Sequence, residues 1–564
     1  MSDDDEDMPL SKRQAYTNPH INVEQMLDNV HPIRIHQSGM MIEEMLEVVE
    51  EVHADFFLDM NQEQSRAFRI AAEHFMFSTM EQMLLFITGV GGTGKSHIIK
   101  AIIALFKRCG CPKNLLLSAP TGSAAILIDS YTIHALTFLP GKDETNKQSE
   151  LESIWGKVRY LILDEISMVS AKLLCQISKC IAIGKHADPN SLDKPFGGVN
   201  VIFAGDLGQL RPIGNASLFS ADLLRRCHAH VKEMKKVQNA LFGASIWRQL
   251  THIVELKENM RAREDHDYAA CLLRMREGNG TLHATDGPSD YDVLQSHVLE
   301  NLQRDKPFEY ALLHDAPVVF GQQRLRDLYN EFKAKEYVQR TGKQLHYYLA
   351  VDKIKKNCLQ GEQRLCVCQI RCKDGKEALG QLPLIVGMPV MITENLSMQN
   401  KIVNGSEGIV KKIIYRTSDK GHEAVCVHVH IRSSPITLEG LTPGIVPIFP
   451  RSVSFDCKSQ QGTRIKISQT QLPLLPAWAF TNYKVQGASL NTVIVDLASA
   501  RGVQHAYVML SRAMKLAGLT VFRPFAPHRI FCCLPQDLWD ELTQITHLDE
   551  YTREWFEHRE KHDA

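Results

Sequence analysis

Short apolar runs alternate with segments of helical periodicity through the first half of the chain. The runs lie at 84–88, 114–118, 158–163 and 199–204. After the first run, apolar side chains recur at roughly helical spacing over 97–108, which predicts a helix. The last three runs end in small or polar residues that begin a loop. This alternation predicts a parallel sheet covered by helices, with ligands held at the carboxyl ends of its strands.

A second region of the same kind starts near residue 251, and its pattern is interrupted. Its apolar runs include 316–320, 492–496 and 519–522. Between these runs the pattern changes. Short segments typical of β-strands, separated by predicted turns, follow one another closely at 408–415, 424–431 and 464–467. Short strands at this spacing predict a small barrel inserted into a second α/β domain.

The two ends differ from the body of the chain. The acidic start and weak periodicity predict a mobile tail with one amphipathic helix near 42–52. At the other end, Leu538, Leu542, Ile545 and Leu548 predict an amphipathic helix that packs back on the body. The expected parts are a tail at 1–54, a first domain at 55–250 with a small insertion at about 130–157, a second domain at 251–534 with the barrel at about 405–468, and a helical tail at 535–564.

Composition and charge fit a multidomain globular protein. The 564 residues exceed what a single core usually holds. The net charge of −1 gives no global basic field, although a narrow basic groove can lie on a neutral protein. The 14 cysteines suit reduced thiols in the cytosol or nucleus, and Cys366, Cys368 and Cys372 leave a zinc site as a minor alternative. No apolar run approaches the ~20 residues of a membrane span, and the acidic start is unlike a signal peptide.

One glycine-rich segment carries the most specific chemistry. Residues 89–96 read Gly-Val-Gly-Gly-Thr-Gly-Lys-Ser, between a predicted strand and a predicted helix. In that context the backbone N–H groups of such a loop cradle phosphates, helped by the helix dipole. We expect Lys95 to reach the β- and γ-phosphates and Ser96 to hold Mg²⁺. The cradle itself consists of Gly89, Gly91, Gly92, Thr93 and Gly94.

Polar groups follow two further predicted strands. Asp164 would hold Mg²⁺, and Glu165 would act as general base toward an attacking water. The alternative is a solvated acidic pair at a strand end. Gln209, which follows the run that ends in Gly205-Asp206, would contact the γ-phosphate or the water. The alternative there is a turn with an exposed glutamine.

Together these motifs resemble the Pif-type and RecD-like group of superfamily-1 DNA helicases, from about residue 58 to 522. The matching segments are 60–64, 119–125, 132–136, 256–261, 382–391, 404–408, 481–487 and 507–513. The resemblance implies two RecA-like P-loop domains with an SH3-like barrel in the second. It also implies ATP and Mg²⁺ as cofactors, Gln64 as adenine reader, and Arg261 and Arg512 as arginine fingers.

The implied activity is ATP-driven 5′–3′ movement on single-stranded DNA and unwinding of duplex, by a nuclear, monomeric protein active in genome maintenance. DNA contacts would be to phosphates and stacked bases. The residues that match the family's DNA-contacting motifs are Pro120, Thr121, His134, Asn404, Thr481, Tyr483, Lys484 and Gln486. Two alternatives remain open: the helicase part of a Helitron-like mobile element, and a DNA-stimulated ATPase without unwinding.

Some positions depart from the family pattern. Arg211-Pro212 stands where Pro-Pro is usual, and Val485 lacks the usual hydroxyl, which bears on coupling rather than on ATP binding. No family signature is evident at 183–198, which predicts a loop. His428 and His430 share one face of a predicted strand, a spacing also found in rolling-circle nuclease metal sites. We favour a structural role for this pair.

Overall fold

The computed structural model describes most of the chain. The described residues are 40–77, 81–139, 148–185, 194–221, 223, 231–261, 263–280, 288–305, 313, 315–354, 357–359, 379–397, 400–418, 421–458, 464–531 and 533–563. The acidic start, the cysteines at 366, 368 and 372, and residues 186–193 of the predicted loop lie outside the described residues.

The first sheet is entirely parallel and has six strands in the order β3-β2-β4-β5-β1-β6. Its strands are β1 (Leu84–Gly89), β2 (Leu115–Ala119), β3 (Tyr131–Thr132), β4 (Tyr160–Leu163), β5 (Asn200–Gly205) and β6 (His252–Leu256). The predicted strands β1, β2, β4 and β5 are confirmed. Because β1 lies between β5 and the edge strand β6, the glycine loop that follows it emerges beside the loop that follows β5.

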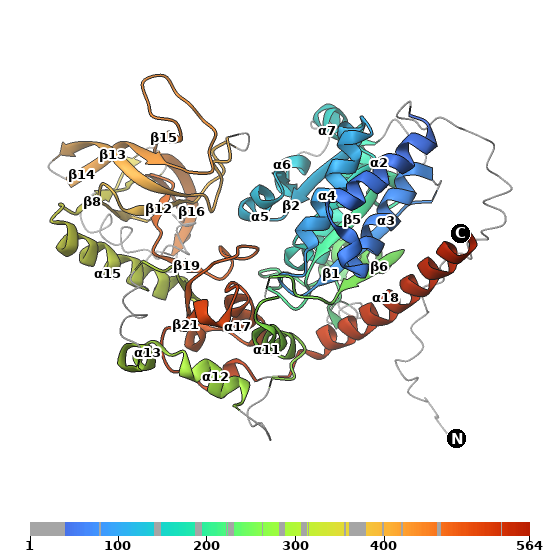
Figure 1. Cartoon of the computed structure of the whole chain (residues 1–564). Helices are drawn as coiled ribbons and strands as arrows, with labels where there is room; N and C mark the ends of the chain where they lie inside the picture. The colour runs from blue at the N-terminus through green and yellow to red at the C-terminus, as the bar shows by residue number, and fades with distance from the viewer. Residues whose placement is uncertain are drawn as a thin grey trace, which may run out of the picture.

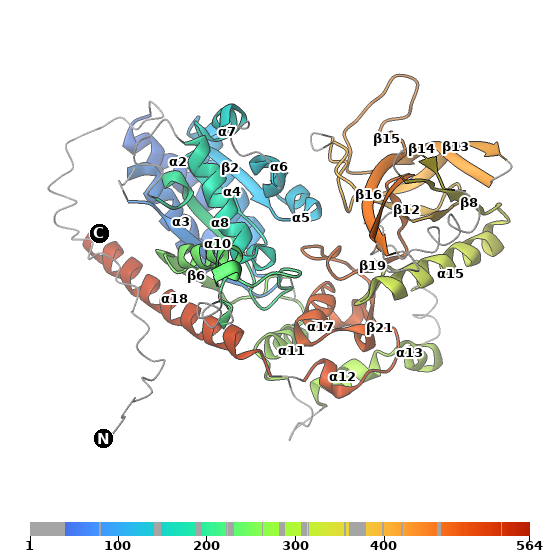
Figure 2. The ribbon, with the colours of Figure 1, turned by 180° about the vertical axis from the view of Figure 1, so that it is seen from behind.

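Helices cover both faces of this sheet because side chains of a buried strand alternate between two cores. Leu84 and Phe86 face one core, and Leu85 and Ile87 face the other. The core that contains Leu85 and Ile87 is closed by α2 (Ile42–Asp55), α3 (Gln62–Phe77) and α4 (Lys95–Arg108) (Figure 1). The opposite core is closed by α6 (Ile133–Thr137), α7 (Gln148–Trp155), α8 (Ala171–Gly184) and α10 (Val231–Trp247) (Figure 2).

Two expected boundaries of the first domain are wrong. Met45, Val49 and Val52 of α2 are buried in the core, so residues 42–54 belong to the domain rather than to a tail. The first sheet also continues past residue 250, because β6 pairs in parallel with β1. The sequence contains β6 as a short apolar run, but it does not reveal which sheet the run joins.

The second sheet is smaller and also parallel, in the order β19-β7-β20-β21. Its strands are β7 (Val318–Phe320), β19 (Ala479–Thr481), β20 (Val493–Asp496) and β21 (Leu519–Val521). The accompanying helices are α11 (His266–Arg276), α12 (Asp290–Ser296), α13 (Leu299–Asp305), α15 (Gln323–Thr341) and α17 (Val503–Leu510). Two parallel sheets with helices confirm the predicted α/β class.

A barrel-like antiparallel sheet interrupts the second domain, as predicted, but it is larger than expected. Its order is β11-β8-β14-β13-β12-β18, with β15 paired to β14. The strands are β8 (His346–Leu349), β11 (Gln381–Leu384), β12 (Pro389–Ile392), β13 (Glu407–Ser418), β14 (Gly421–His430), β15 (Ile445–Ile448) and β18 (Leu474–Pro476). The limits of about 405–468 are therefore wrong: four strands lie outside them.

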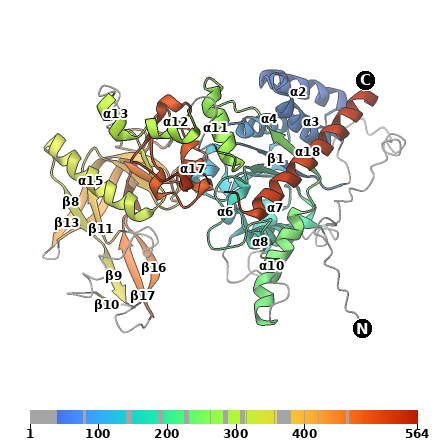
Figure 3. The same ribbon diagram turned by 90° about the horizontal axis from the view of Figure 1, so that it is seen from below.

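The last part of the predicted barrel forms a separate arm. β16 (Arg451–Lys458) and β17 (Arg464–Gln471) pair with each other, and β17 pairs with β9 (Val351–Ile354), which also pairs with β10 (Asn357–Cys358). This four-stranded sheet projects away from the barrel (Figure 3).

The helix α18 (Gln536–Asp563) returns from the second domain to the first (Figure 1). Asp549 pairs with Arg66 and accepts the N–H of Glu255 at 3.1 Å. Thr552 accepts the N–H of Ile253 at 3.1 Å. The packing of this helix on the body is thus confirmed, and the helix covers the open edge of β6. Among the described helices, none combines the length and apolar character needed to cross a bilayer.

Candidate functional site

The glycine loop between β1 and α4 is shaped so that its backbone stays exposed to a ligand. Gly92 and Gly94 have φ of 103° and 92°. A Cβ on Gly92 would lie 2.5 Å from Cβ of Arg261, and one on Gly94 would lie 2.3 Å from Nε2 of Gln64. Only glycine fits at these two positions. The loop amides and the start of α4 therefore form a concave surface suited to phosphate.

Lys95 lies at the centre of this site. Its Nζ donates to the carbonyls of Gly89 at 2.7 Å and Val90 at 3.0 Å. Burial lowers the pKa of Lys95, while the nearby carboxylates of Asp206, Glu165 and Asp164 raise it. An ammonium group among carboxylates, next to an amide cradle, fits a triphosphate with a divalent metal ion. Ser96 is exposed at the first turn of α4.

The acidic pair follows β4, as predicted, and is buried. Asp164 Oδ1 accepts the N–H of Glu165 at 2.8 Å. Burial, together with the neighbouring Glu165, raises the pKa of Asp164 to about 7. Glu165 has φ of 51°, a left-handed conformation that side chains other than glycine seldom adopt. From the second domain, Gln486 Nε2 donates to Glu165 Oε2 at 2.9 Å.

The raised pKa of Asp164 predicts a pH-dependent metal requirement. A protonated carboxyl is a poor metal ligand, so protons compete with Mg²⁺ below about pH 7. We expect the Mg²⁺ concentration for half-maximal ATPase to rise by up to about tenfold per pH unit as pH falls below that pKa. Steady-state ATPase titrated with Mg²⁺, corrected for protonation of ATP itself, measures this. A requirement that stays constant with pH would contradict it.

Two arginines flank the glycine loop from the other side. Arg261 is held by two backbone carbonyls: its backbone N–H donates to Gly92 O at 3.1 Å, and its Nη1 donates to Ser511 O at 2.9 Å. Arg512 is buried, and its Nη2 lies 3.6 Å from where a Gly91 Cβ would be. Burial and the nearby Arg261 lower the pKa of Arg512 to about 10. Both predicted fingers therefore reach the phosphate loop.

The two glutamines that were predicted for the nucleotide site, Gln64 and Gln209, also lie here. Gln64 Nε2 donates to Thr93 O at 3.1 Å, so Gln64 is fixed against the glycine loop. Gln209 is buried, and its Oε1 accepts no hydrogen bond from any described residue. A buried amide oxygen without a partner is costly, and this one is free to accept from a water or another ligand.

Three residues that the sequence analysis did not assign join this site. Asp206 accepts from Arg276 Nε at 2.9 Å and from the Tyr507 hydroxyl at 2.8 Å. Tyr507 in turn accepts the N–H of Gly91 at 2.9 Å. Burial alone would raise the pKa of Asp206, but Arg276 and Lys95 lower it overall. Asp206 and Tyr507 stood within motifs that were quoted for other residues, whereas nothing in the sequence marked Arg276.

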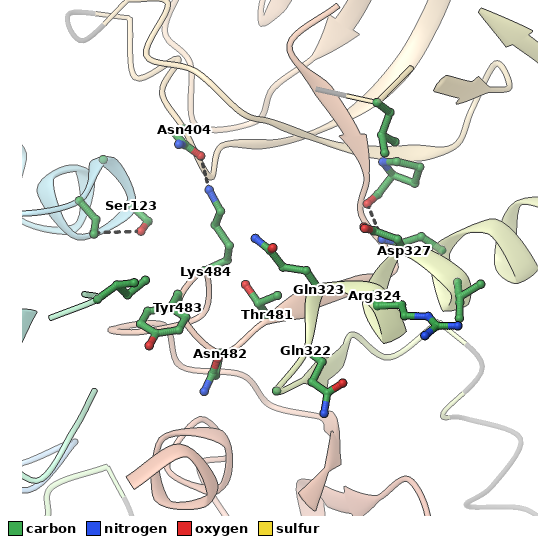
Figure 4. A pocket seen from close by; sticks show the side chains of 18 of the residues that line it. Ser123, Gln322, Gln323, Arg324, Asp327, Asn404, Thr481, Asn482, Tyr483 and Lys484 are labelled. Carbon is green, nitrogen blue, oxygen red and sulfur yellow. Dashed lines mark hydrogen bonds between the residues drawn. The ribbon is translucent and has the colours of Figure 1, made fainter. Parts of the chain in front are cut away.

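A groove of about 1440 Å³ runs between the two domains and the barrel (Figure 4). Its lining includes seven of the eight predicted DNA-contacting residues: Pro120, Thr121, His134, Asn404, Thr481, Tyr483 and Lys484. Lys484 extends across the groove, and its Nζ contacts Asn404 Oδ1 (Figure 4). The placement of Gln486 differs from expectation: it is buried against Glu165, outside the lining.

The groove is lined by residues of mixed charge that the sequence analysis passed over. They include Gln322, Gln323, Arg324, Asp327, Arg501 and His505. The Tyr483 and His505 rings meet edge to face, with centroids 5.9 Å apart. Burial lowers the pKa of His134, so this side chain is neutral near pH 7 and offers a ring and a hydrogen bond rather than a charge.

The paired histidines of β14 are explained by the sheet. His428 lies opposite Lys412 and Pro447, and His430 opposite Ile409 and Ile445. No group of three or more His, Cys, Asp or Glu side chains placed to hold a metal ion occurs among the described residues.

Comparisons with known proteins agree with this architecture. Residues 59–286 match the family model of PIF1-like helicases. The chain is 30% identical to ATP-dependent DNA helicase PIF1 of Danio rerio over 447 residues, which is 78% of this chain and 58% of that protein. For the Xenopus laevis protein of the same name the identity is 29% over 446 residues, with the same shares. The chain thus spans less than two thirds of the length of these relatives.

Solved structures show the same fold. The Pif1 helicase of Candida albicans superposes with a TM-score of 0.59 and 24% identity, over 86% of this chain and 98% of that one. A Pif1 helicase from Bacteroides, solved with ADP-AlF3 and single-stranded DNA, gives a TM-score of 0.58 at 23% identity, over 85% and 96% of the two chains. The α/β class with two RecA-like domains is therefore confirmed.

Proposed function

We propose that this chain, which contains a PIF1-like helicase domain and is homologous to Pif1 helicases, is an ATP-dependent DNA helicase. It would move 5′–3′ on single-stranded DNA and unwind tailed duplex in genome maintenance, as a monomer in the nucleus. The observation that supports this best is a nucleotide site built from both domains: Lys95 and Glu165 come from the first, and Gln486 and Arg512 from the second.

The residues of the site divide the work of hydrolysis between them. Bound ATP with Mg²⁺ supplies a phosphoanhydride whose cleavage releases the free energy. The loop amides and Lys95 neutralise the phosphates, while Ser96 and Asp164 would hold the metal ion. Glu165 accepts a proton from the attacking water, which Gln209 orients through its unpartnered Oε1. Arg261 and Arg512 stabilise the charge that develops at the γ-phosphate.

One short segment joins this chemistry to the groove. Residues 481–484 line the groove, and Gln486 binds Glu165 only two positions later. A strand of DNA that moves Lys484 therefore also moves the partner of the general base. This gives a direct route for DNA to stimulate hydrolysis.

The change at Val485 is compatible with this route. Its side chain is buried, and its carbonyl accepts from Arg512 Nη1 at 3.2 Å. The backbone of this position thus holds the arginine finger, a function that needs no hydroxyl on the side chain. We accordingly prefer unwinding over an ATPase that does not unwind.

Substitution of Lys484 with alanine should weaken binding of single-stranded DNA, because its Nζ lies in the groove, where it contacts Asn404 Oδ1 (Figure 4). We expect about a tenfold loss at low salt and a salt slope smaller by about 0.7–1. Fluorescence anisotropy with labelled oligo(dT) at several salt concentrations measures both. Lys107→Ala, at an exposed position of α4 remote from the groove lining, is the matched control and should leave both values unchanged.

The proposed activity is tested with ATPase and strand-displacement assays on 5′-tailed, 3′-tailed and blunt duplexes. We expect DNA-stimulated hydrolysis and unwinding of the 5′-tailed substrate alone. Unwinding restricted to 3′-tailed duplex would overturn the direction. Robust hydrolysis without strand separation would select the ATPase alternative instead.

A further inference from the structure

A buried tyrosine connects the phosphate loop with the second domain. Tyr507 lies on α17, and its side chain is 1% exposed. Its hydroxyl accepts the N–H of Gly91 at 2.9 Å and donates to Asp206 Oδ2 at 2.8 Å. A single oxygen of the second domain therefore satisfies two groups of the first domain, one in the glycine loop and one at the end of β5.

The carboxylate that receives this hydrogen bond is itself held from two sides. Asp206 is fully buried. Its Oδ1 accepts from Arg276 Nε at 2.9 Å and from the N–H of Gly208 at 3.0 Å. Arg276 lies at the end of α11, which packs against α17 in the core of the second domain. Both cross-domain donors to Asp206 thus come from two helices that pack against each other, α11 and α17.

The two groups that Tyr507 contacts, Gly91 and Asp206, lie beside Arg512 and Lys95 of the candidate nucleotide site. Gly91 faces the second domain, since Arg512 Nη2 and Ser511 Oγ lie 3.6 Å from where its Cβ would be. Asp206 lies close enough to Lys95 for each to shift the other's pKa. Burial and Asp206 raise the pKa of Tyr507, so the phenol keeps its proton and can accept and donate at once.

We propose that Tyr507 is a positioning residue for hydrolysis. Its hydroxyl holds the Gly91 peptide and the Asp206 carboxylate in place relative to Arg512, which follows the end of α17. When α11 and α17 move, the phosphate loop and the end of β5 move with them through this hydroxyl. The proposal rests on the proposed ATPase function, because a positioning role in hydrolysis requires that the chain hydrolyses ATP.

Tyr507→Phe tests the role because it removes one oxygen and little volume. Tyr268→Phe is the matched control. Tyr268 is equally buried, on α11, and its hydroxyl donates to Leu510 O at 2.7 Å within the second domain. Both variants lose one buried hydroxyl in the same core, but only Tyr507 reaches across to the first domain.

The steady-state ATPase of the full chain, with and without oligo(dT), should separate the two variants. We expect Tyr507→Phe to lower kcat by about 10–100-fold, while KM for ATP stays within about threefold, because alignment rather than a nucleotide contact is lost. Tyr268→Phe should keep kcat within about threefold at a comparable loss of melting temperature. Equal kcat values for the two variants would overturn the proposal.

Hydrogen exchange provides a readout that does not need activity. Without nucleotide, the amides of residues 89–94 should exchange faster in Tyr507→Phe than in wild type or Tyr268→Phe. Unchanged exchange there would also overturn the proposal, even if kcat fell. A wild-type chain without ATPase activity would refute the proposed function, and the exchange experiment would still report on the Tyr507 contact.

Discussion

Replacing Lys95 with alanine should abolish ATP turnover, with a loss in kcat of at least about 10²–10³. The Lys95 ammonium is the cation that lies among three carboxylates, those of Asp164, Glu165 and Asp206. Without it, less positive charge remains beside these carboxylates to offset the charge of the triphosphate. The loss should therefore affect nucleotide binding as well as the chemical step.

The same variant should change the pH profile of any residual activity. Lys95 lowers the pKa of Asp164 and of Asp206, so both pKa values rise when the ammonium is removed. A carboxyl with a raised pKa is ionised only at higher pH, and residual turnover should shift toward alkaline pH. Lys100→Ala, at an exposed position of the same helix, is the control. Turnover of Lys95→Ala within a few-fold of wild type would refute the role of Lys95.

Replacing Arg512 with alanine should leave nucleotide binding largely intact and reduce hydrolysis by about 10³–10⁵. In the structure its guanidinium donates to backbone carbonyls of Val485 and Ala488, both at 3.2 Å, and to Ser511 Oγ at 2.7 Å. It is therefore oriented by its own domain, with Nη2 directed at the glycine loop. Under the proposed function, Arg512 would act when the γ-phosphate lies between the domains.

Two measurements separate this role from a structural one. Binding of a fluorescent ADP analogue should stay within a few-fold of wild type, while single-turnover hydrolysis collapses. Arg512→Lys keeps the charge but not the planar set of donors, so it should recover only a small part of the rate. Undiminished turnover in Arg512→Ala would remove the assignment.

The clustering of the candidate site residues was largely predictable because the signals for it are local. Lys95, Asp164 and Gln209 each follow an apolar strand, and the ends of neighbouring parallel strands meet at one edge of a sheet. The structure places β4, β5 and β1 side by side. The motif residues therefore come together without any knowledge of the rest of the fold.

The parts that escaped prediction depend on contacts distant in sequence. Gln486 belongs to the same motif as Lys484, but the turns after β19 place the two on different sides of the chain. The barrel strand β8 pairs in parallel with β14 at Tyr348 and His422. No local sequence pattern predicts this pairing. In the sequence, Arg276 looks like any other charged residue of a helix. Its pairing with Asp206 becomes evident only in the structure.

The return of α18 to the first domain has a consequence for synthesis of the protein on the ribosome. The outer edge of β6 is completed by Thr552 and Asp549, yet almost the entire second half of the chain is translated in between. During that interval an unprotected strand edge is exposed, and such edges promote aggregation. We therefore expect nascent chains stalled before α18 to require chaperones more than the finished protein does.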